Sequence, residues 1–268
     1  MPLSAPRIFD QQHYALLNRA RGDAAACLLN ELKDALHLRT AVDVGCGLGH
    51  FSGLLQSLGF NVVAVDGRRE NVEEAARRNP NVSFRTANVE DPGVRTLGTF
   101  DLTLCFGLLY HLENPLLGIR HLRALTKTLL LAESVICQGD VPSMVLVDEA
   151  LEDDQGLEHM AFYPTEACLI KMFYRVGFTH VYRFAEQPGH ADYAATGETR
   201  RVRTMLAASL QPMDSRRLVL ADDRRVDMQP WNARSDVLRG TAGEKLKSFA
   251  QKPLPEKFRS IKRIIGTR

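Results

Sequence analysis

The sequence predicts an α/β protein with a doubly wound sheet, and three observations lead to this fold class. Short apolar runs of strand type alternate with stretches of helical spacing along residues 39–210. One of these runs breaks into a glycine turn from Gly45 to Gly49 and continues as a helix, and the next run ends in Asp66. Parallel strands joined by crossover helices are the arrangement that such alternation favours.

The first strand and its turn are predicted from residues 41–52, AVDVGCGLGHFS. Gly45 and Gly47 permit positive φ and carry no Cβ, so the backbone can approach a ligand closely at the N-terminus of the following helix. That helix is indicated by apolar residues at helical spacing, namely Phe51, Leu54, Leu55 and Leu58. A strand, a glycine turn and a helix in this order are typical of a site for a nucleotide-like cofactor.

The second strand is predicted over residues 61–66, NVVAVD, and ends in an acid. Asp66 lies 21 positions after Gly45. This offset is close to the roughly 20 residues at which an acid at the tip of a second strand reaches the hydroxyls of a ribose. The glycine turn and the acid together are more specific for a ribose-bearing ligand than either alone.

Five further strands are predicted at residues 81–86, 100–106, 128–136, 181–185 and 201–210. Asn114 and Pro115 are typical of an N-cap and a first helical position, and they predict a helix to about Leu125. Another helix is predicted over about residues 164–176. The last two strands are joined by a loop too short for a crossover helix, so an antiparallel hairpin is expected. The predicted sheet therefore has seven strands, of which the last is antiparallel.

Three further segments flank or interrupt this sheet. Residues 1–38 are expected to form an N-terminal helical cap, and residues 139–162 an acidic insertion over the active site, with a helical stretch from Val145. Residues 211–268 form a basic extension with 14 Lys and Arg against 7 Asp and Glu, whereas the rest of the chain carries 20 against 25. The main domain is thus expected over residues 39–210.

The composition is typical of a water-soluble chain. Of its 268 residues, 45% are hydrophobic, and no run of 18 or more apolar residues occurs. The first residues lack an apolar stretch of signal-peptide length, and the five cysteines show no paired spacing, so reduced thiols in a cytoplasm are expected. Neither Cys-x-x-Cys nor His-x-x-x-His is present, and no zinc site is predicted. The net charge of +2 does not by itself indicate a polyanionic partner.

The stretch from Asp43 to Gly49, DVGCGLG, has the pattern acid-x-Gly-x-Gly-x-Gly. In this it resembles the first motif of the class I S-adenosylmethionine-dependent methyltransferases. A dinucleotide dehydrogenase would require Gly-x-Gly-x-x-Gly, and His50 stands at the position of its last glycine. The resemblance covers roughly residues 40–210 and implies a Rossmann-like methyltransferase fold, S-adenosylmethionine as the cofactor and no metal.

The resemblance also implies a set of cofactor-binding residues: Tyr14, Asp43, Gly45, Cys46, Gly47, Asp66, Gly67, Asn88, Val89 and Phe106. Asp43 would orient the methionine amino group and the glycine turn, and Asp66 would hold the ribose diol. Asn88 stands where many members have Asp, and its amide oxygen can accept the same hydrogen bond from adenine. Phe106 would lie beside the amino-acid end. Tyr14 would reach the methionine carboxylate, unless its helix only packs on the sheet edge.

Catalysis by such an enzyme is an in-line displacement at the sulfonium methyl group, for which the protein supplies alignment and often a base. His111 is predicted as this base, since a neutral imidazole accepts a proton near pH 7, and Tyr110 beside it is expected to contact the acceptor. His111 could instead only brace the loop after the fourth strand or the cofactor. Glu133, expected to open toward the cleft, is a weaker base candidate, and His159 in the insertion is a second one.

The acceptor is less well defined, because function on a shared fold is set by the grafted site. Methylation of an exocyclic base amine is disfavoured, since the sequence CFGL at residues 105–108 replaces the Asn-Pro-Pro-Tyr of such enzymes. The loop LLYHLENP and the later stretch FYPTEACLIKMFYRVGF resemble small-molecule methyltransferases and a branch that modifies the wobble uridine of transfer RNA.

Three functions follow, in order of preference. The first is O-methylation of a small hydroxylated metabolite, such as a sugar or glycan precursor. The second is modification of transfer RNA, in which the basic extension would bind phosphates; its residues 254–265 could form a short basic helix that meets RNA, an anionic membrane surface or only solvent. The third is a non-catalytic cofactor-binding protein or a subunit of an oligomer.

Overall fold

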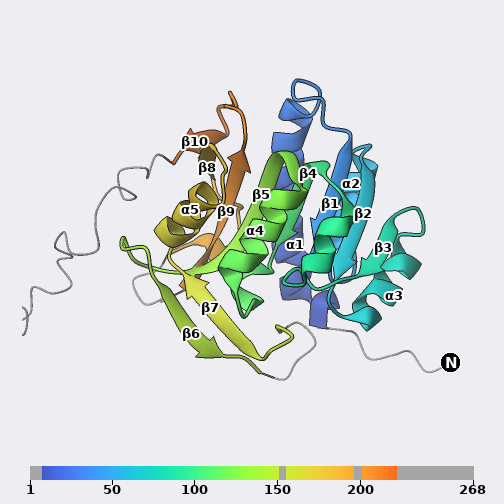
Figure 1. Cartoon of the computed structure of the whole chain (residues 1–268), viewed down its shortest axis with the longest axis horizontal. Coiled ribbons are helices and arrows are strands. Elements are labelled where there is room, and N and C mark those ends of the chain that lie inside the picture. The colour runs from blue at the N-terminus through green and yellow to red at the C-terminus, as the bar shows by residue number, and fades with distance from the viewer. Residues whose placement is uncertain (1–7, 151–154, 196–200, 222–268) are drawn as a thin grey trace, which may run out of the picture. The chain divides into compact units, whose positions relative to one another are not determined.

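An eight-stranded sheet forms the centre of the computed structural model, which describes residues 8–150, 155–195 and 201–221 (Figure 1). From one edge to the other its strands are β10 (Leu218–Leu220), β8 (His180–Phe184), β9 (Arg201–Ser209), β5 (Thr126–Cys137), β4 (Phe100–Phe106), β1 (Thr40–Val44), β2 (Asn61–Asp66) and β3 (Ser83–Thr86). The strands from β5 to β3 are parallel, whereas β9 runs antiparallel to both β5 and β8. The predicted parallel sheet and its antiparallel hairpin are confirmed.

The sheet is one strand wider than predicted. β10 pairs antiparallel with β8, Leu218 opposite Phe184 and Leu220 opposite Tyr182. A run of three apolar residues is too short to be recognised as a strand in the sequence. The strand lies in the segment expected as a basic extension, so the first part of that segment belongs to the sheet. The rest of the extension, residues 222–268, lies outside the described residues, as does its expected basic helix.

Helices cover both faces of the sheet (Figure 1). α1 (Gln12–Leu32) and α2 (His50–Ser57) lie on one face, α4 (Pro115–Leu125) and α5 (Glu166–Arg175) on the other, and α3 (Arg69–Arg78) beside β2 and β3. The 3-10 helices of the described chain are η1 (Ile8–Asp10), η2 (Pro92–Leu97), η3 (Leu109–His111) and η4 (Ala191–Tyr193). No helix within the described ranges is long and apolar enough to span a membrane.

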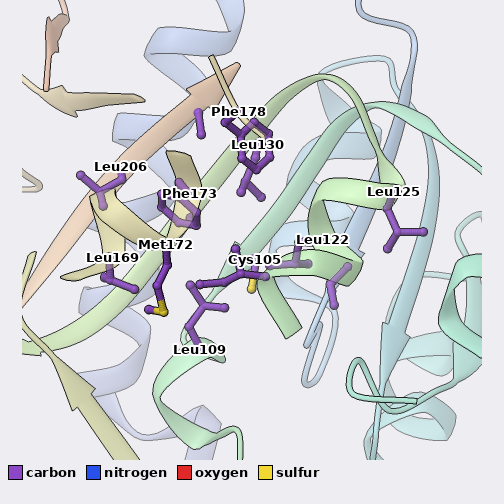
Figure 2. Packing of buried hydrophobic residues seen from close by; sticks show 14 of the residues in the cluster. Cys105, Leu109, Leu122, Leu125, Leu130, Leu169, Met172, Phe173, Phe178 and Leu206 are labelled. Carbon is purple, nitrogen blue, oxygen red and sulfur yellow. The ribbon is translucent and has the colours of Figure 1, made fainter. Parts of the chain in front are cut away.

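The core under α4 and α5 is made of large side chains that are almost fully buried (Figure 2). Among them are Leu122, Leu125, Leu130, Leu169, Met172, Phe173, Phe178 and Leu206. Burial of each such side chain stabilises the fold by about 1.5–3 kcal/mol. Both helices begin at a side-chain cap, because Asn114 Oδ1 accepts from Leu117 N at 3.1 Å and Thr165 Oγ1 from Cys168 N at 3.2 Å. The predicted N-cap at Asn114 is confirmed.

The insertion forms a β-hairpin, so the helical stretch expected from Val145 is wrong. β6 (Met144–Asp148) pairs antiparallel with β7 (Met160–Pro164), and neither strand pairs with the main sheet. Valine at positions 145 and 147 favours an extended chain, and β7, the next strand along the chain, satisfies the backbone groups of β6. The hairpin brings an acidic segment to the carboxyl edge of the main sheet, where the site lies.

Candidate cofactor and active site

A cavity of about 1340 Å³ opens at the carboxyl ends of β1, β2 and β4. These ends meet at one edge because the three strands are parallel and in register, with Val44 beside Val65 and Asp43 beside Leu104. The cavity wall combines the glycine turn, Asp66 and the segment after β4 with residues of α1, the β6–β7 hairpin and β9. Ligands of open α/β sheets bind at this edge.

The glycine turn has the backbone conformation that its sequence predicts. Gly45 has φ +78° and Gly47 has φ +51°, in the left-handed region that favours glycine. The N–H groups of Gly45 and Cys46 both donate to Val65 O, at 2.8 and 3.0 Å, which ties the turn to β2. A Cβ on Gly45 would lie 2.9 Å from Leu108 Cδ2. The turn therefore has no room for a side chain at this position.

Asp66 is fixed at the end of β2 by three donors. Its Oδ2 accepts from Gly47 N at 2.9 Å, and its Oδ1 accepts from Arg68 N at 2.9 Å and from Asn71 Nδ2 at 3.2 Å. The carboxylate lines the cavity beside the glycine turn. Its two oxygens have further lone pairs with which to accept hydrogen bonds from a ribose diol.

Asp43 differs from the other predicted cofactor residues, because it does not line the cavity. Its side chain is buried within β1, and its Oδ2 accepts from the hydroxyl of Ser52 at 2.6 Å. Burial, reinforced by the charge of Asp66 and opposed by the Ser52 hydrogen bond, raises the pKa of Asp43 to about 7. In this position the carboxyl group links β1 to α2 below the glycine turn.

The remaining predicted cofactor residues all lie on the cavity wall: Tyr14, Cys46, Gly67, Asn88, Val89 and Phe106. The ring of Phe106 packs edge-on against Phe51 with centroids 5.0 Å apart. Asn88 Oδ1 accepts from Glu90 N at 2.9 Å and retains a second lone pair. Tyr14 comes from the first turns of α1, which brings it from the N-terminal cap to the same cavity.

Residues 107–114 connect β4 to α4 and are called the base loop. Its two catalytic candidates, Tyr110 and His111, lie in η3 and line the cavity. His111 Nδ1 is 2.6 Å from Oε1 of Glu149, which follows strand β6 of the hairpin. The hydroxyl of Tyr110 accepts from Arg203 Nη2 at 3.3 Å, and the Arg203 guanidinium lies 5.6 Å from the ring centroid of Tyr110. Burial raises the pKa of Tyr110, so its phenol stays protonated near pH 7.

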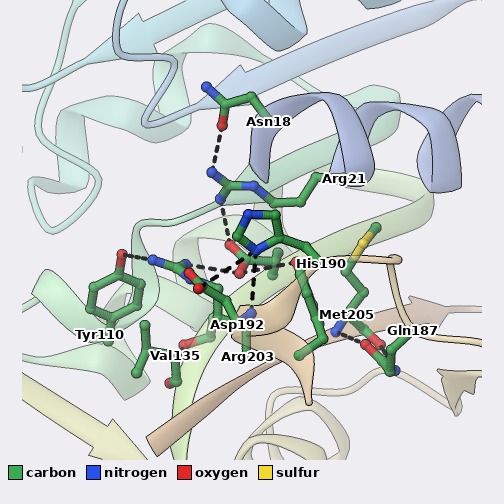
Figure 3. Close-up of polar contacts among 12 residues, drawn as sticks. Asn18, Arg21, Tyr110, Val135, Gln187, His190, Asp192, Arg203 and Met205 are labelled. Atoms are coloured by element: carbon green, nitrogen blue, oxygen red, sulfur yellow. Dashed lines mark hydrogen bonds and ion pairs between the residues drawn. The ribbon is translucent and has the colours of Figure 1, made fainter. Parts of the chain in front are cut away.

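Glu133 does not open toward the cleft, which corrects the expectation from the sequence. It lies within β5, which extends to Cys137, and its side chain is fully buried. Arg21 and Arg203, both labelled in Figure 3, donate to its two oxygens at 2.8 and 2.9 Å. The Tyr193 hydroxyl donates to the same carboxylate at 3.3 Å. Burial raises the pKa of Glu133, but the two guanidinium groups outweigh it and the net shift is downward. This geometry favours a structural role for Glu133 over a role as a catalytic base.

Three residues of the site were not singled out in the sequence: Arg21, Arg203 and Glu149. Arg203 is a charged residue inside the strand RVRTMLAAS, two positions after its first residue, which is a signal that could have found it. Arg21 gives no such signal on its helix, and Glu149 is one of several acids in the same segment. His159, the second base candidate, is exposed in the hairpin with φ +55° and is not among the residues that line the cavity.

His13, His190 and Asp192 form a group that could hold a metal ion, the one such group found within the described ranges. Their ligand atoms lie within 4.8 Å of one another. The carboxylate of Asp192 is already compensated, because Arg203 Nε donates to its Oδ2 at 3.3 Å. His190 Nδ1 is also engaged, since it accepts from Asp192 N at 3.2 Å. Methyl transfer from S-adenosylmethionine by class I enzymes needs no metal.

Comparison with known proteins agrees with this geometry. The methyltransferase domain family matches residues 15–182. The tRNA U34 carboxymethyltransferase of Haemophilus influenzae is 31% identical over 154 residues, which cover 53% of this chain and 46% of the relative. The ubiquinone biosynthesis O-methyltransferase of Vibrio parahaemolyticus is 30% identical over 101 residues, 36% of this chain and 43% of the relative. The chain thus spans about half the length of the curated relatives it matches.

Solved structures share the fold at low sequence identity. The N-terminal domain of EvdMO1 with bound S-adenosylhomocysteine has a TM-score of 0.57 and 20% identity, over 75% of this chain and 85% of that domain. Magnesium protoporphyrin IX methyltransferase from Synechocystis PCC 6803, also with bound S-adenosylhomocysteine, has a TM-score of 0.51 and 20% identity, over 78% and 90% of the two chains.

Proposed function

Since this chain belongs to the methyltransferase domain family and is a class I S-adenosylmethionine-dependent methyltransferase, we propose that it transfers the methyl group to a hydroxyl of a small, uncharged acceptor. One observation carries the proposal: His111 lines the same cavity as the glycine turn and Asp66. A base and a cofactor site that share one cavity are what methylation of a hydroxyl requires.

The size of the cavity supports a second molecule beside the cofactor. Typical ligand sites have volumes of about 300–1000 Å³, and this cavity has about 1340 Å³. The glycine turn, Asp66 and Asn88 border the part that fits the cofactor. His111, Tyr110 and the residues of the hairpin and β9 border the rest, which is the space for the acceptor.

When bound, S-adenosylmethionine supplies an electrophilic methyl group on a positively charged sulfur. The chain must hold the acceptor oxygen in line with that carbon and remove its proton. In the proposed reaction His111 accepts the hydroxyl proton at Nε2 as the oxygen–carbon bond forms and the carbon–sulfur bond breaks. Tyr110, protonated and fixed by Arg203, presents its ring and hydroxyl to the acceptor.

The charges on the cavity wall support an uncharged acceptor. The wall includes six carboxylates against four guanidinium groups: Asp10, Asp66, Glu90, Glu149, Glu158 and Asp192 against Arg21, Arg68, Arg78 and Arg203. An anionic acceptor would meet net repulsion there, because charges of one sign in a cleft repel ligands of that sign. Sugars and phenols carry hydroxyl groups without a negative charge and fit this wall.

Modification of transfer RNA is the second candidate, and the likeness to tRNA U34 carboxymethyltransferases favours it. The basic composition of residues 211–268 is the further support. In that case a chain truncated after Ala221, which keeps β10, should lose salt-sensitive binding to transfer RNA, because phosphate contacts release counterions. Equal RNA affinity of the truncated and full chains at 50 and 200 mM salt would count against this candidate.

The test of the proposal is transfer of labelled methyl from S-adenosylmethionine into a cell extract that is then separated into small-molecule, glycan, RNA and protein fractions. Label is expected among small molecules or glycans, and Asp66→Ala should weaken cofactor binding by about 10- to 100-fold, since it removes charge-assisted hydrogen bonds. Label confined to RNA would support the second candidate. Cofactor binding without any label would indicate a non-catalytic binding protein.

A further inference from the structure

Glu149 of the hairpin segment contacts His111 of the base loop, and this contact suggests a role for Glu149 in catalysis. Glu149 has a side chain only 3% exposed, and His111 one only 10% exposed. One carboxylate oxygen of Glu149 lies 2.6 Å from His111 Nδ1, a charge-pair contact whose angles do not meet those of a hydrogen bond, and the other accepts from Gly156 N at 2.8 Å. We infer that Glu149 is the positioning residue for His111, an inference that rests on the proposed function.

The local fold fits Glu149 to this place. Its N–H donates to His159 O at 3.0 Å, which holds it at the end of the β6–β7 pairing. A Cβ at Gly156 would lie 2.6 Å from His111 O and 2.9 Å from Glu149 Oε2, so only glycine lets the hairpin approach the base loop this closely. The neighbouring Asp148 is exposed, in contrast to Glu149. Of the acidic residues that the structure describes in this segment, Glu149 is the one whose carboxylate contacts His111.

The chemistry of imidazole explains what this carboxylate does. A neutral histidine has one N–H donor and one acceptor nitrogen, and the group bonded to one nitrogen decides the state of the other. The negative charge of a carboxylate this close to Nδ1 favours a proton on that nitrogen and leaves the Nε2 lone pair for the acceptor hydroxyl. It also stabilises the imidazolium that forms when His111 takes that proton, as a third group does for other catalytic bases.

The hairpin that carries Glu149 is also tied to the cofactor side of the cavity. Arg68 Nη2 donates to Gln155 O at 3.0 Å and to Gly156 O at 3.2 Å, while Arg68 N donates to Asp66 Oδ1 at 2.9 Å. A Cβ at Gly67 would meet Leu157 Cδ1 at 2.7 Å, which shows how closely the two segments pack. The segment that positions the base is thus anchored beside the carboxylate expected to bind ribose.

The first experiment measures the tautomer of His111 directly and needs no acceptor. Nitrogen-15 NMR of histidine-labelled full-length protein distinguishes protonated Nδ1 from protonated Nε2, and a His111→Gln sample assigns the signal. The Nδ1–H form is expected in the wild type, with a shift toward the Nε2–H form in Glu149→Ala. Nε2–H in the wild type, or the same tautomer in Glu149→Ala, would overturn the inference.

The second experiment compares rates of labelled methyl transfer into the small-molecule fraction at saturating S-adenosylmethionine. Glu149→Ala should lower kcat by about 10- to 100-fold, as expected when a general base loses its orientation. Glu149→Asp should restore part of the rate, and Glu149→Gln, which keeps the shape but not the charge, should be intermediate. The KM for S-adenosylmethionine should change less than about twofold in all three variants.

Asp148→Asn is the matched control, since it removes one negative charge at the adjacent exposed position. Its kcat should equal that of the wild type, and thermal denaturation checks that all variants fold. A normal kcat in Glu149→Ala and Glu149→Gln would overturn the inference while leaving the proposed function intact. Absence of transfer in the wild type, together with the Nδ1–H tautomer, would refute the proposed function but not the orientation of His111.

Discussion

The two halves of the cavity are built in different ways. The cofactor half is made of consecutive residues at the ends of neighbouring strands, such as the turn after β1 and Asp66, and its contacts are mostly to the backbone. The half proposed for the acceptor is lined by side chains from distant segments, such as Tyr110 and Arg203, 93 residues apart, and Arg21 behind it is held by the buried Glu133, 112 residues away. A local motif therefore identifies the cofactor, whereas only the folded chain defines the acceptor space.

Buried charge pairs support the half proposed for the acceptor. Breaking one of them should lower the free energy of unfolding more than the other substitutions below. Arg203→Ala leaves the buried carboxylate of Glu133 with Arg21 as its remaining cation, and loss of one partner of a buried pair costs about 3–5 kcal/mol. Urea denaturation measures this as a lower free energy of unfolding. Arg69→Ala is the control, since its pair with Glu73 is exposed and contributes at most about 0.5 kcal/mol.

A side chain in the glycine turn should strongly weaken cofactor binding. It should lower the free energy of unfolding less than Arg203→Ala does. Gly45→Ala places a methyl group 2.9 Å from Leu108 Cδ2 at φ +78°, so the turn must shift. Binding of S-adenosylhomocysteine, measured by calorimetry, should weaken by about 100-fold, equivalent to roughly 2.7 kcal/mol.

Gly98→Ala provides the control for this substitution. Gly98 also has positive φ, at +92°, but a Cβ there meets nothing within 4 Å. The variant should lose about 1–2 kcal/mol of stability through backbone strain alone and bind the cofactor normally. If both glycine variants bound the cofactor equally well, close packing of the turn would not be what the cofactor half requires.

The smallest effect is expected at the amino ends of the parallel strands, away from the cavity. Contacts to the backbone there should contribute to stability and not to ligand binding. Burial opposes ionisation of Asp101, but hydrogen bonds from Thr40 N, Arg39 N and Lys127 Nζ lower its pKa to about 2. The folded state therefore favours the ionised form, and this contribution is present above about pH 4 and is lost as the pH falls through 2.

Asp101→Asn should accordingly lower the free energy of unfolding by about 1 kcal/mol at pH 7, after allowance for solvent screening. The difference from the wild type should narrow toward pH 2, as measured by urea denaturation across this range. A difference that stayed constant with pH would mean that the carboxylate charge is not what stabilises this end of the sheet.

The sequence predicts those parts of the molecule whose structure follows from neighbouring residues. The strands from β1 to β5, the glycine turn and the N-cap at Asn114 depend on local pattern, and all are confirmed. β6, β7 and β10 were not predicted, because each is short and its backbone groups are satisfied only by pairing with another strand.

The same reason explains what the sequence predicts of the site. Nine of the ten predicted cofactor residues line the cavity, eight of them at or after strand ends and Tyr14 from α1, and Asp43 does not because it lies within β1 below the turn. Glu133 was expected to face the cleft, but two arginines from α1 and β9 enclose it. Nothing in the local sequence indicates a pairing of this kind, nor that of Glu149 with His111.

The separate pairing of β6 and β7 has a consequence for how the enzyme family can change over time. Because the hairpin shares no strand pairing with the main sheet, its length and side chains can vary without altering the register of the strands that carry the cofactor site. If the inferred role of Glu149 holds, a hairpin of different sequence would still have to keep its carboxylate beside His111 and a glycine at position 156, where a Cβ would lie 2.6 Å from His111 O.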